Sequence, residues 1–172
     1  DQILSHYLNS SQSKEKSVKP ELLFGQAAVA SAKLAFQRFL KIFSNESDRW
    51  RKLSQNGALL QRPLWASTST KDPLYSDVKY VEPLIGPNTI NTMPEATIAA
   101  FADHGIIKEN AVFENINHAQ QVMNDLSQLG IHLDKIAWRL ENEGIQKFID
   151  PYNKLMENIA LKQQQFLEKN IG

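Results

Sequence analysis

Apolar side chains recur at three- and four-residue steps in the first third of the chain, which is the pattern of an amphipathic helix. Within residues 20–43 this stripe is formed by Leu23, Ala27, Ala30 and Leu34. A proline opens the segment, and proline suits the first turn of a helix because its missing N–H has no partner there. The pattern predicts one long helix over residues 20–43.

Polar segments lie on both sides of this helix. Residues 9–19 are low in complexity and predict a solvated loop. Residues 49–56 form a shorter helical pattern, which Asp48 is placed to cap. Gly57 follows, and glycine commonly ends a helix in the left-handed conformation.

Two short apolar runs predict β-strands. Residues 62–68, RPLWAST, are too short for a helix and predict a buried strand, and residues 89–93, TINTM, predict a second one. Between them, residues 71–88 contain three prolines and predict an irregular loop with at most one helical turn. The second strand leads directly into a helical pattern over residues 94–105. Strands that stand alone between helices, without hairpin turns, are typical of parallel pairing.

The rest of the chain, residues 113–172, is dominated by helical patterns. The loop before it leaves room for a short third strand around Val112. Asn115 or Asn117 is placed to cap a helix over residues 118–130.

A proline interrupts the last helical pattern. Asp134 is placed to cap residues 135–144, and residues 145–170 continue the pattern. Pro151 lacks an N–H and clashes with the preceding turn, so it should either kink or restart the helix. With two or three isolated strands among these helices, the chain is expected to be a helix-rich α/β protein.

Composition narrows the classes of partner. The 172 residues include 19 basic and 19 acidic side chains, so no global field attracts nucleic acid or an anionic membrane. The absence of cysteine excludes disulfides and thiolate zinc sites and fits a reducing cytoplasm. No apolar run is long enough for a membrane span, and the first residues lack a signal-peptide pattern. Because residue 1 is Asp, we expect the chain to begin inside a longer product or to have been trimmed.

The hydroxyl run after the first strand is the main candidate site. It consists of Ser67, Thr68, Ser69 and Thr70, followed by Lys71. Ligands bind at the carboxyl ends of parallel strands in α/β folds, and hydroxyls, backbone N–H groups and an ammonium together suit a phosphate group. We therefore expect Ser67 and Lys71 to bind phosphate. The alternative is a polar loop that happens to hold a lysine, and no glycine-rich nucleotide-binding pattern is present.

A second possible role of Lys71 is that of a Schiff-base nucleophile. Such an amine must be partly neutral, which requires an apolar pocket that lowers its pKa. Lys71 instead follows four hydroxyl residues and precedes Asp72, a setting that favours the charged ammonium. The phosphate role is therefore preferred.

A second candidate segment lies at the end of the second strand. The amide of Asn91 and the hydroxyl of Thr92 are placed to contact a polyol or a carbonyl group of a substrate. The alternative is that Asn91 only satisfies nearby backbone groups at a strand-to-helix turn.

The histidines form no catalytic or metal pattern. His104 stands beside Asp103 at a predicted helix end and is interpreted as a cap that interacts with the helix dipole. His118 and His132 have no second ligand at metal spacing, so no metal site is expected. No catalytic residue is assigned in this chain.

Residues 61–105, from QRPLWASTSTKDP to AFADHG, resemble the central stretch of bacterial transaldolases of the longer subtype. The segments GQAAVASAKLAFQRF before it and LSQLGIHLDKIAWRLENEGIQKF after it resemble the matching flanks. Relatives often have Asn where this chain has Asp72. The carboxylate of Asp72 is expected to weaken a phosphate interaction of Lys71.

The resemblance implies a partial (β/α)8 TIM barrel that covers roughly the last three βα units, the sixth to the eighth. It also implies an enzyme of the pentose phosphate pathway without a metal or an organic cofactor. Such enzymes transfer a dihydroxyacetone unit from sedoheptulose 7-phosphate to glyceraldehyde 3-phosphate through a Schiff base. By this resemblance, the phosphate role is carried over to Ser67 and Lys71, and substrate contacts are carried over to Asn91 and Thr92.

The resemblance further implies that essential parts lie outside this chain. The Schiff-base lysine and the acid–base residues of the family lie on earlier strands, and no segment here matches them. A (β/α) barrel needs about 250 residues, so we expect a fragment that is inactive alone. Because its strand edges are unpaired, it should dock on the missing N-terminal half of the barrel or on a second copy. The alternative is a non-catalytic half-barrel that serves as an interaction or regulatory module of a fusion protein.

Overall fold

In a computed structural model of the chain, residues 2–8 and 18–170 are described. The chain forms two compact units, Asp1–Gly130 and Ile131–Gly172, each of which is treated by itself. Most of the loop predicted over residues 9–19 lies outside the described residues.

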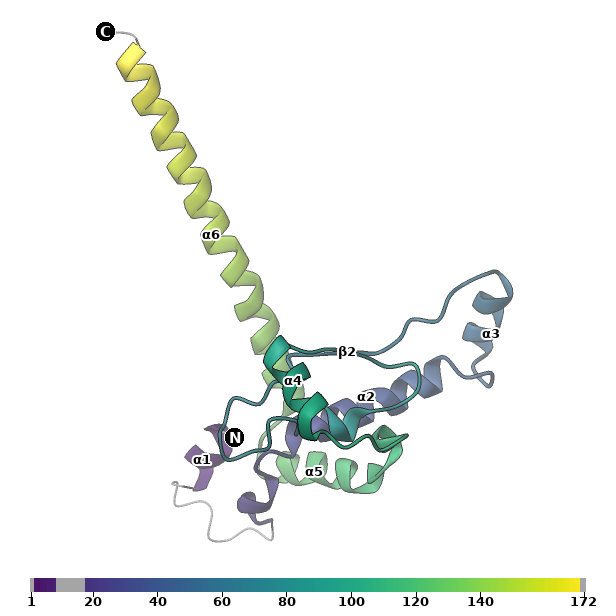
Figure 1. Cartoon of the computed structure of the whole chain (residues 1–172). Helices are drawn as coiled ribbons and strands as arrows, with labels where there is room; N and C mark the ends of the chain where they lie inside the picture. The colour runs from purple at the N-terminus through teal and green to yellow at the C-terminus, as the bar shows by residue number, and fades with distance from the viewer. Residues whose placement is uncertain (1, 9–17, 171–172) are drawn as a thin grey trace. The chain divides into compact units, whose positions relative to one another are not determined.

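The first unit contains short helices and two strands (Figure 1). Its α-helices are α1 (Gln2–Leu8), α2 (Ala27–Ile42), α3 (Asp48–Gln55), α4 (Glu95–His104) and α5 (Ile116–Gln128). Its 3-10 turns are η2 (Pro20–Leu23), η3 (Glu82–Leu84) and η4 (Ala111–Phe113). Its strands are β1 (Leu64–Ala66) and β2 (Ile90–Thr92). In the second unit, α6 (Leu133–Asn170) is the helix that the structure describes.

The core of the first unit is built by α2 and α5, which pack against each other. Helix α2 buries Ala30, Phe36 and Phe39, and α5 buries Ala119, Val122 and Leu126; Ala30 belongs to the stripe predicted for residues 20–43. The ring of Phe36 is fully buried and meets the ring of Phe113 edge-on, with centroids 5.1 Å apart. Residues of the η4 turn thereby close the core on the side of α2.

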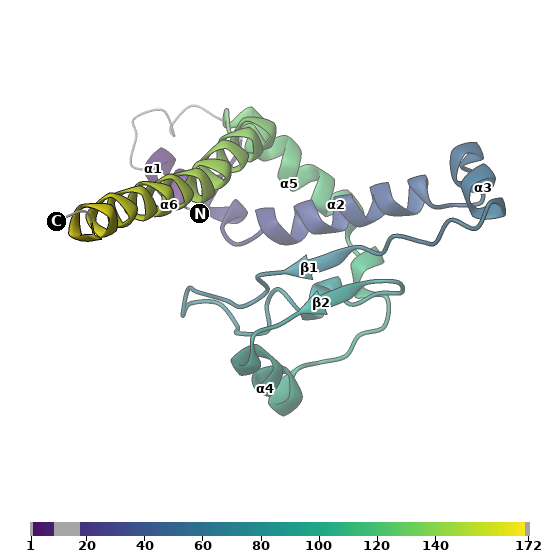
Figure 2. The ribbon, with the colours of Figure 1, turned by 90° about the horizontal axis from the view of Figure 1, so that it is seen from above.

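The two strands pair in parallel, as the isolated strand patterns predicted. Figure 2 shows them side by side, with α2 next to β1 and α4 next to β2. The strand predicted over residues 62–68 is confirmed at Leu64–Ala66, but its predicted length and burial are wrong, because β1 has three residues and Leu64 is 51% exposed. A strand is buried only when elements cover both of its faces, and one face of this short sheet is open.

A glycine divides the long helix that was predicted over residues 20–43. The segment is split into η2 and α2, and Gly25 between them has a φ of +67°. L-residues disfavour this left-handed conformation, whereas glycine adopts it freely. The predicted single helix is therefore wrong at its first two turns.

Helix ends differ from the predictions in detail. Ser47, not Asp48, caps α3, since its side chain accepts a hydrogen bond from the backbone N–H of Trp50 at 3.3 Å. Gly57 ends that helix with a φ of +85°, as predicted. Asn115 occupies the N-cap position of α5, although no side-chain hydrogen bond accompanies it.

The later part of the chain contains two further corrections. The segment around Val112 forms the 3-10 turn η4 and not a third strand, so the described residues contain two of the two or three strands predicted. The helix does not restart at Pro151, because α6 runs through it without interruption. Asp134 lies inside the first turn of α6. The predicted helical region over residues 113–172 holds α5 and α6.

Candidate functional site

The carboxyl ends of β1 and β2 lie at one edge of the sheet. Because the strands are parallel, with Ala66 opposite Thr92, the hydroxyl run leaves the sheet beside the end of β2. Residues 67–71 follow the end of β1 and residues 91–92 end β2, and we call these residues the strand-end edge. The parallel pairing that places the two strand ends together was predicted from the sequence.

A side-chain hydrogen bond joins the two segments of the strand-end edge. Thr68 Oγ1 donates to Asn91 Oδ1 across 2.8 Å, and Thr68 is only 4% exposed. A second bond runs from Thr92 Oγ1 to the carbonyl oxygen of Trp65 across 3.3 Å. Within the described part of the chain, Asn91 Nδ2 has no recorded partner, so it is the group that Asn91 can still offer to a ligand.

Asn91 and Thr92 point to opposite faces of the sheet because successive side chains of a strand alternate. Asn91 stands opposite Trp65, whose ring packs on the aromatic core and whose Nε1–H donates to the carbonyl oxygen of Leu84 at 3.2 Å. Thr92 is exposed on the other face. A ligand that contacts both side chains must therefore lie beyond the strand end, where the two faces meet.

Ser67 marks the point where β1 ends. Its φ of +57° lies in the left-handed region, which costs a residue with a Cβ about 1–2 kcal/mol. This turn interrupts the strand alternation, so Ser67 stays exposed while Thr68 is buried. Strained backbone of this kind is often found at binding sites, and here it lies on a residue that the sequence had singled out.

The loop after Thr68 is held by short-range hydrogen bonds. Thr70 Oγ1 donates to the carbonyl oxygen of Ser76 at 2.8 Å, and the Leu74 N–H donates to Asp72 Oδ1 at 3.0 Å. Oδ1 of the Asp72 carboxylate is thus engaged in a local hydrogen bond, two residues along the chain. Lys71 is exposed, and no ion pair of its Nζ is recorded among the described residues.

Two small hollows lie near the strand-end edge. One, of about 290 Å³, is lined by Ser67 and Thr68 together with residues of α2, β1 and η3. The other, of about 240 Å³, is lined by Asn91 and Thr89 and otherwise mainly by apolar residues. Neither lining includes Lys71 or Thr92. Ser67 and Asn91 therefore line different hollows, and the four predicted residues do not share one cavity.

A larger hollow of about 1010 Å³ lies between the end of α2 and α3. Three cationic side chains, Arg38, Lys41 and Arg49, contribute to its lining. None of the predicted site residues belongs to its described lining. These cationic side chains make it an alternative candidate for anion binding on the first unit.

Sequence reasoning missed Lys33, a lysine in the core side of α2. Lys33 is only 6% exposed, and its Nζ donates to the carbonyl oxygens of Ala111 at 2.9 Å and Glu114 at 2.8 Å. Burial lowers its pKa, the Glu114 carboxylate opposes that change, and Lys108 lowers the pKa further. The signal was present in the sequence, because Lys33 lies three residues after Ala30 on the apolar stripe.

His104 lies in the last turn of α4, where its imidazole contacts two carboxylates. Its Nε2 lies 2.8 Å from Asp77 Oδ1, and its Nδ1 lies 3.1 Å from Asp103 Oδ2. The pKa of His104 is raised, first by the hydrogen bond to Asp77 and then by that to Asp103, against a smaller effect of desolvation. The imidazole therefore links the end of α4 to the loop before η3.

The described residues contain no cluster of three or more His, Asp or Glu side chains that could hold a metal ion. In the part of the chain that the structure covers, no helix is both long enough and apolar enough to cross a bilayer.

Comparisons with known proteins give a consistent result. Residues 2–159 match the profile of the family described as transaldolase/fructose-6-phosphate aldolase. A protein named transaldolase from Parafrankia sp. (strain EAN1pec) is 48% identical over 141 residues, which cover 82% of this chain and 38% of that protein. A transaldolase from Frankia alni is 47% identical over 138 residues, covering 80% of this chain and 37% of the relative.

A third relative gives a longer match. A transaldolase from Trichodesmium erythraeum is 44% identical over 164 residues, which cover 94% of this chain and 42% of that protein. The chain thus spans between 37% and 42% of the length of these three relatives.

Proposed function

Because the chain belongs to the transaldolase/fructose-6-phosphate aldolase family, we propose that it forms the sugar-phosphate-binding edge of a transaldolase. In this proposal the intact enzyme is a cytoplasmic TIM barrel, and the chain contributes its last βα units. The intact enzyme transfers a dihydroxyacetone unit from sedoheptulose 7-phosphate to glyceraldehyde 3-phosphate through a Schiff base in the pentose phosphate pathway.

The observation that carries this proposal is the joining of the two strand ends. Parallel pairing brings the end of β1 beside the end of β2. The hydrogen bond from Thr68 Oγ1 to Asn91 Oδ1, with a length of 2.8 Å, connects the two strand ends. Ligands of (β/α) barrels bind at the carboxyl ends of the strands. The strand-end edge is therefore the place in this chain where a substrate of the family would bind.

The phosphate group is assigned to Ser67 and Lys71. The hydroxyl of Ser67 is exposed at the tight turn that ends β1, and the ammonium of Lys71 is exposed four residues later. A lysine of this kind attracts a phosphate as a point charge. Among the described residues, the Asp72 carboxylate forms no ion pair with the Lys71 ammonium. Asp72 Oδ1 instead accepts a hydrogen bond from the backbone N–H of Leu74.

The sugar is assigned to Asn91 and Thr92. Asn91 Oδ1 accepts a hydrogen bond from the Thr68 hydroxyl. The amide Nδ2 of Asn91 is therefore left to donate to a sugar oxygen. Thr92 lies on the open face of the sheet, where further strands of a barrel would enclose the substrate.

The bond-forming amine is placed outside this chain. Such an amine needs an apolar enclosure that favours its neutral form, and Lys71 is exposed. Lys33 is buried, but its Nζ donates to two carbonyl oxygens on the core side of α2 and not at the strand ends. The chain alone is therefore expected to be catalytically inactive.

The open face of the sheet supports further βα units as the partner. Leu64 is 51% exposed and Ala66 is exposed on this face, although both belong to a strand. The relatives are more than twice as long as the matched part of this chain, so their remaining segments are the occupant we propose. The same open face is the feature that would serve a non-catalytic half-barrel module.

Calorimetric titration of the 172-residue chain with fructose 6-phosphate tests the proposal. Binding that is lost in Lys71→Ala but retained in Lys52→Ala, an exposed lysine on α3, is the expected result. Fructose without the phosphate should bind at least about tenfold more weakly, since the ammonium–phosphate attraction is absent. Equal binding by the two lysine variants would contradict the phosphate assignment.

Borohydride trapping tests the position of the nucleophile. Reduction in the presence of fructose 6-phosphate should leave this chain unlabelled, because a trapped imine requires a lysine that the proposal places elsewhere. A covalent label mapped to Lys71 would overturn its role as a phosphate ligand.

A further inference from the structure

The loop that carries Lys71 is closed by a hydrogen bond across its base. Thr70 Oγ1 donates to the carbonyl oxygen of Ser76 at 2.8 Å, so residues 70–76 form a short closed loop that includes Lys71. This bond joins two residues of the loop itself and is exposed to solvent. The orientation of the Lys71 ammonium therefore depends on how the base of the loop is held on the rest of the first unit.

The residue that follows the base of this loop contacts the end of a helix. Asp77 Oδ1 lies 2.8 Å from His104 Nε2, and His104 is the last residue of α4. These two residues are 27 positions apart in the sequence. Because Asp77 directly follows Ser76, this contact connects the base of the Lys71 loop with α4.

Helix α4 continues the strand that carries the other half of the strand-end edge. It begins at Glu95, three residues after β2 ends at Thr92, and Figure 2 shows it next to β2. A second contact supports the same connection, because the backbone N–H of Ile106 donates to Glu82 Oε1 at 2.9 Å. The segment after β1 and the segment after β2 are thus joined at the far end of α4 as well as at the strand ends.

The imidazole of His104 contacts two carboxylates and donates to both only when it is protonated. In addition to the contact of Nε2 with Asp77, its Nδ1 lies 3.1 Å from Asp103 Oδ2. A neutral imidazole has one N–H group, whereas the imidazolium has two. The pKa of His104 is raised accordingly, by Asp77 first and then by Asp103. The pair of contacts is therefore complete in the protonated form and incomplete in the neutral form.

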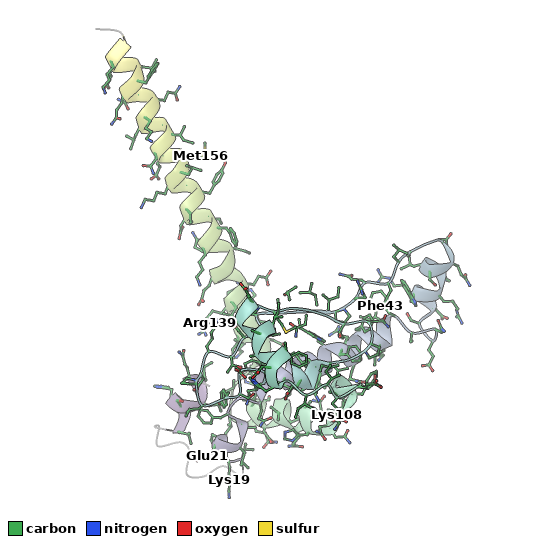
Figure 3. All side chains as sticks on the ribbon, in the orientation of Figure 1. Lys19, Glu21, Phe43, Lys108, Arg139 and Met156 are labelled. Carbon is green, nitrogen blue, oxygen red and sulfur yellow. The ribbon has the colours of Figure 1, made fainter. Side chains whose placement is uncertain are left out.

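The charged groups that act on this imidazole come from two elements. Asp103 belongs to α4 itself, and Asp77 belongs to the loop segment packed against its end. The next basic residue along the chain, Lys108, is labelled in Figure 3 and pairs with Glu114 at 2.7 Å. In the part of the chain that the structure describes, His104 is thus the partner of the Asp77 carboxylate.

We propose that Asp77 and His104 are a positioning pair that holds the Lys71 loop in the orientation that binds a sugar phosphate. This inference rests on the proposed function, because the phosphate is assigned there to Lys71. The pair acts through the loop, since neither of its side chains is assigned to the ligand. The two side chains are 59% and 48% exposed, and exposed ion pairs have small effects, so a change of about threefold is expected when the pair is broken.

Amide hydrogen exchange of the ligand-free chain tests the hold on the loop. His104→Gln and Asp77→Ala should each raise the exchange rates of the amides of residues 74–75 by about threefold at pH 6. These two amides donate to acceptors within the loop, so their exchange reports its opening. The measurement needs no ligand and therefore does not depend on the proposed function.

A matched control separates opening of the loop from a general loss of stability. Asp48→Asn removes an exposed carboxylate that pairs with Arg51 on α3, and it should leave the exchange rates of the loop unchanged. The amide of Val122, in the interior of α5, should stay protected in every variant. Unchanged loop rates in both variants of the pair, or an equal rise at Val122, would overturn the proposal.

Calorimetric titration with fructose 6-phosphate tests the consequence for binding. The dissociation constant of His104→Gln, divided by that of the wild type, should be about three at pH 6 and should approach one well above the raised pKa of His104. Taking this ratio at each pH cancels the titration of the phosphate group, whose second pKa is about 6. The double variant with Asp77→Ala should bind no more weakly than either single variant, because both changes remove the same contact.

The outcomes distinguish this inference from the proposed function. If Lys71→Ala binds as tightly as the wild type, the proposed function fails and this inference fails with it. If Lys71→Ala loses binding but the ratio for His104→Gln stays constant with pH, the phosphate assignment stands and the positioning role of the pair is overturned. Additive losses in the double variant would overturn the positioning role in the same way.

Discussion

The hydroxyl of Thr68 donates a hydrogen bond to the amide oxygen of Asn91 across 2.8 Å, so that a buried residue after β1 fixes a half-buried residue in β2. This bond connects two segments that are 23 residues apart in the sequence. It sets the rotamer of Asn91 and leaves Nδ2 as the donor available to a ligand. The geometry of the strand-end edge depends on this contact.

Replacing Thr68 by Val should destabilise the first unit. Valine has a similar shape but no donor, so Asn91 Oδ1 would stay buried in part without its partner, at a cost of about 1–3 kcal/mol. Thr68→Ser keeps the hydroxyl and should recover most of this loss. Urea unfolding measures the free energies of unfolding, and an unchanged stability in Thr68→Val would show that the bond contributes nothing.

Replacing Lys33 by Met should destabilise the packing of η4 on α2. The methionine keeps the apolar stem but removes both donors, which leaves the carbonyl oxygen of Glu114 without the side-chain donor it has now. The expected loss is about 1–3 kcal/mol. Lys41→Met, on an exposed position of the same helix, is the matched control and should change stability by less than about 0.5 kcal/mol. Equal effects of the two changes would argue against a structural role of Lys33.

Gly25 and Gly57 provide a matched pair of glycine positions. Both have a positive φ, of +67° and +85°. A Cβ on Gly25 would lie 2.6 Å from Lys79 Nζ and 2.9 Å from the ring of Tyr75, whereas a Cβ on Gly57 would meet nothing within 4 Å. Gly57→Ala should therefore cost only the backbone strain of about 1–2 kcal/mol, and Gly25→Ala should cost more.

Thermal unfolding of the two glycine variants checks this difference. The melting temperature should fall further for Gly25→Ala than for Gly57→Ala. A larger effect at Gly57 would mean that the close approach of Tyr75 and Lys79 to Gly25 does not constrain the fold.

The stability that His104 contributes should depend on pH. Its pKa is raised above the ordinary 6.5 by Asp77 and Asp103, so the folded state favours the protonated imidazole. This contribution is fully present below about pH 6.5, the unfolded pKa, and it is lost as the pH rises through the raised folded pKa. His104→Gln should therefore lower the melting temperature near pH 6 and have little effect well above the folded pKa.

Melting curves of the wild type and of His104→Gln across this pH range make the comparison. Asp77→Asn should reproduce most of the effect, because Asp77 is the main cause of the shift. A difference in melting temperature that stays constant with pH would rule out the imidazolium as its source.

Several parts of the fold followed from the sequence because they depend on local patterns. The apolar stripes of α2 and α5 and the left-handed end at Gly57 are local signals. Parallel pairing of β1 and β2 followed from the absence of hairpin turns. The break at Gly25 was missed because an uninterrupted apolar period masks a single glycine, which a helix can tolerate at a cost of about 1 kcal/mol.

Other features depend on neighbours that a linear pattern does not show. An apolar run such as PLWA predicts burial, but Leu64 is exposed because no described element covers its face. Val112 is fully buried in the 3-10 turn η4. Because β-branched residues favour strands, the sequence suggested a strand at this position. Lys33 was missed because lysine is almost never fully buried unless it is paired, and its carbonyl partners lie 78 and 81 residues away.

The candidate site was predicted in the same uneven way. The strand pattern predicted that the hydroxyl run and Asn91 lie at the ends of two parallel strands. The hydrogen bond from Thr68 to Asn91 has no signal in the sequence. The strained φ of Ser67 also has no sequence signal, because serine rarely adopts it.

Amide chemical-shift mapping during a titration with fructose 6-phosphate tests the central claim most directly. The claim is that the strand-end edge binds a sugar phosphate. We expect saturable shifts concentrated in residues 66–72 and 90–93, which disappear in Lys71→Ala. An absence of saturable shifts, or shifts concentrated at Arg38, Lys41 and Arg49 around the larger hollow, would contradict it.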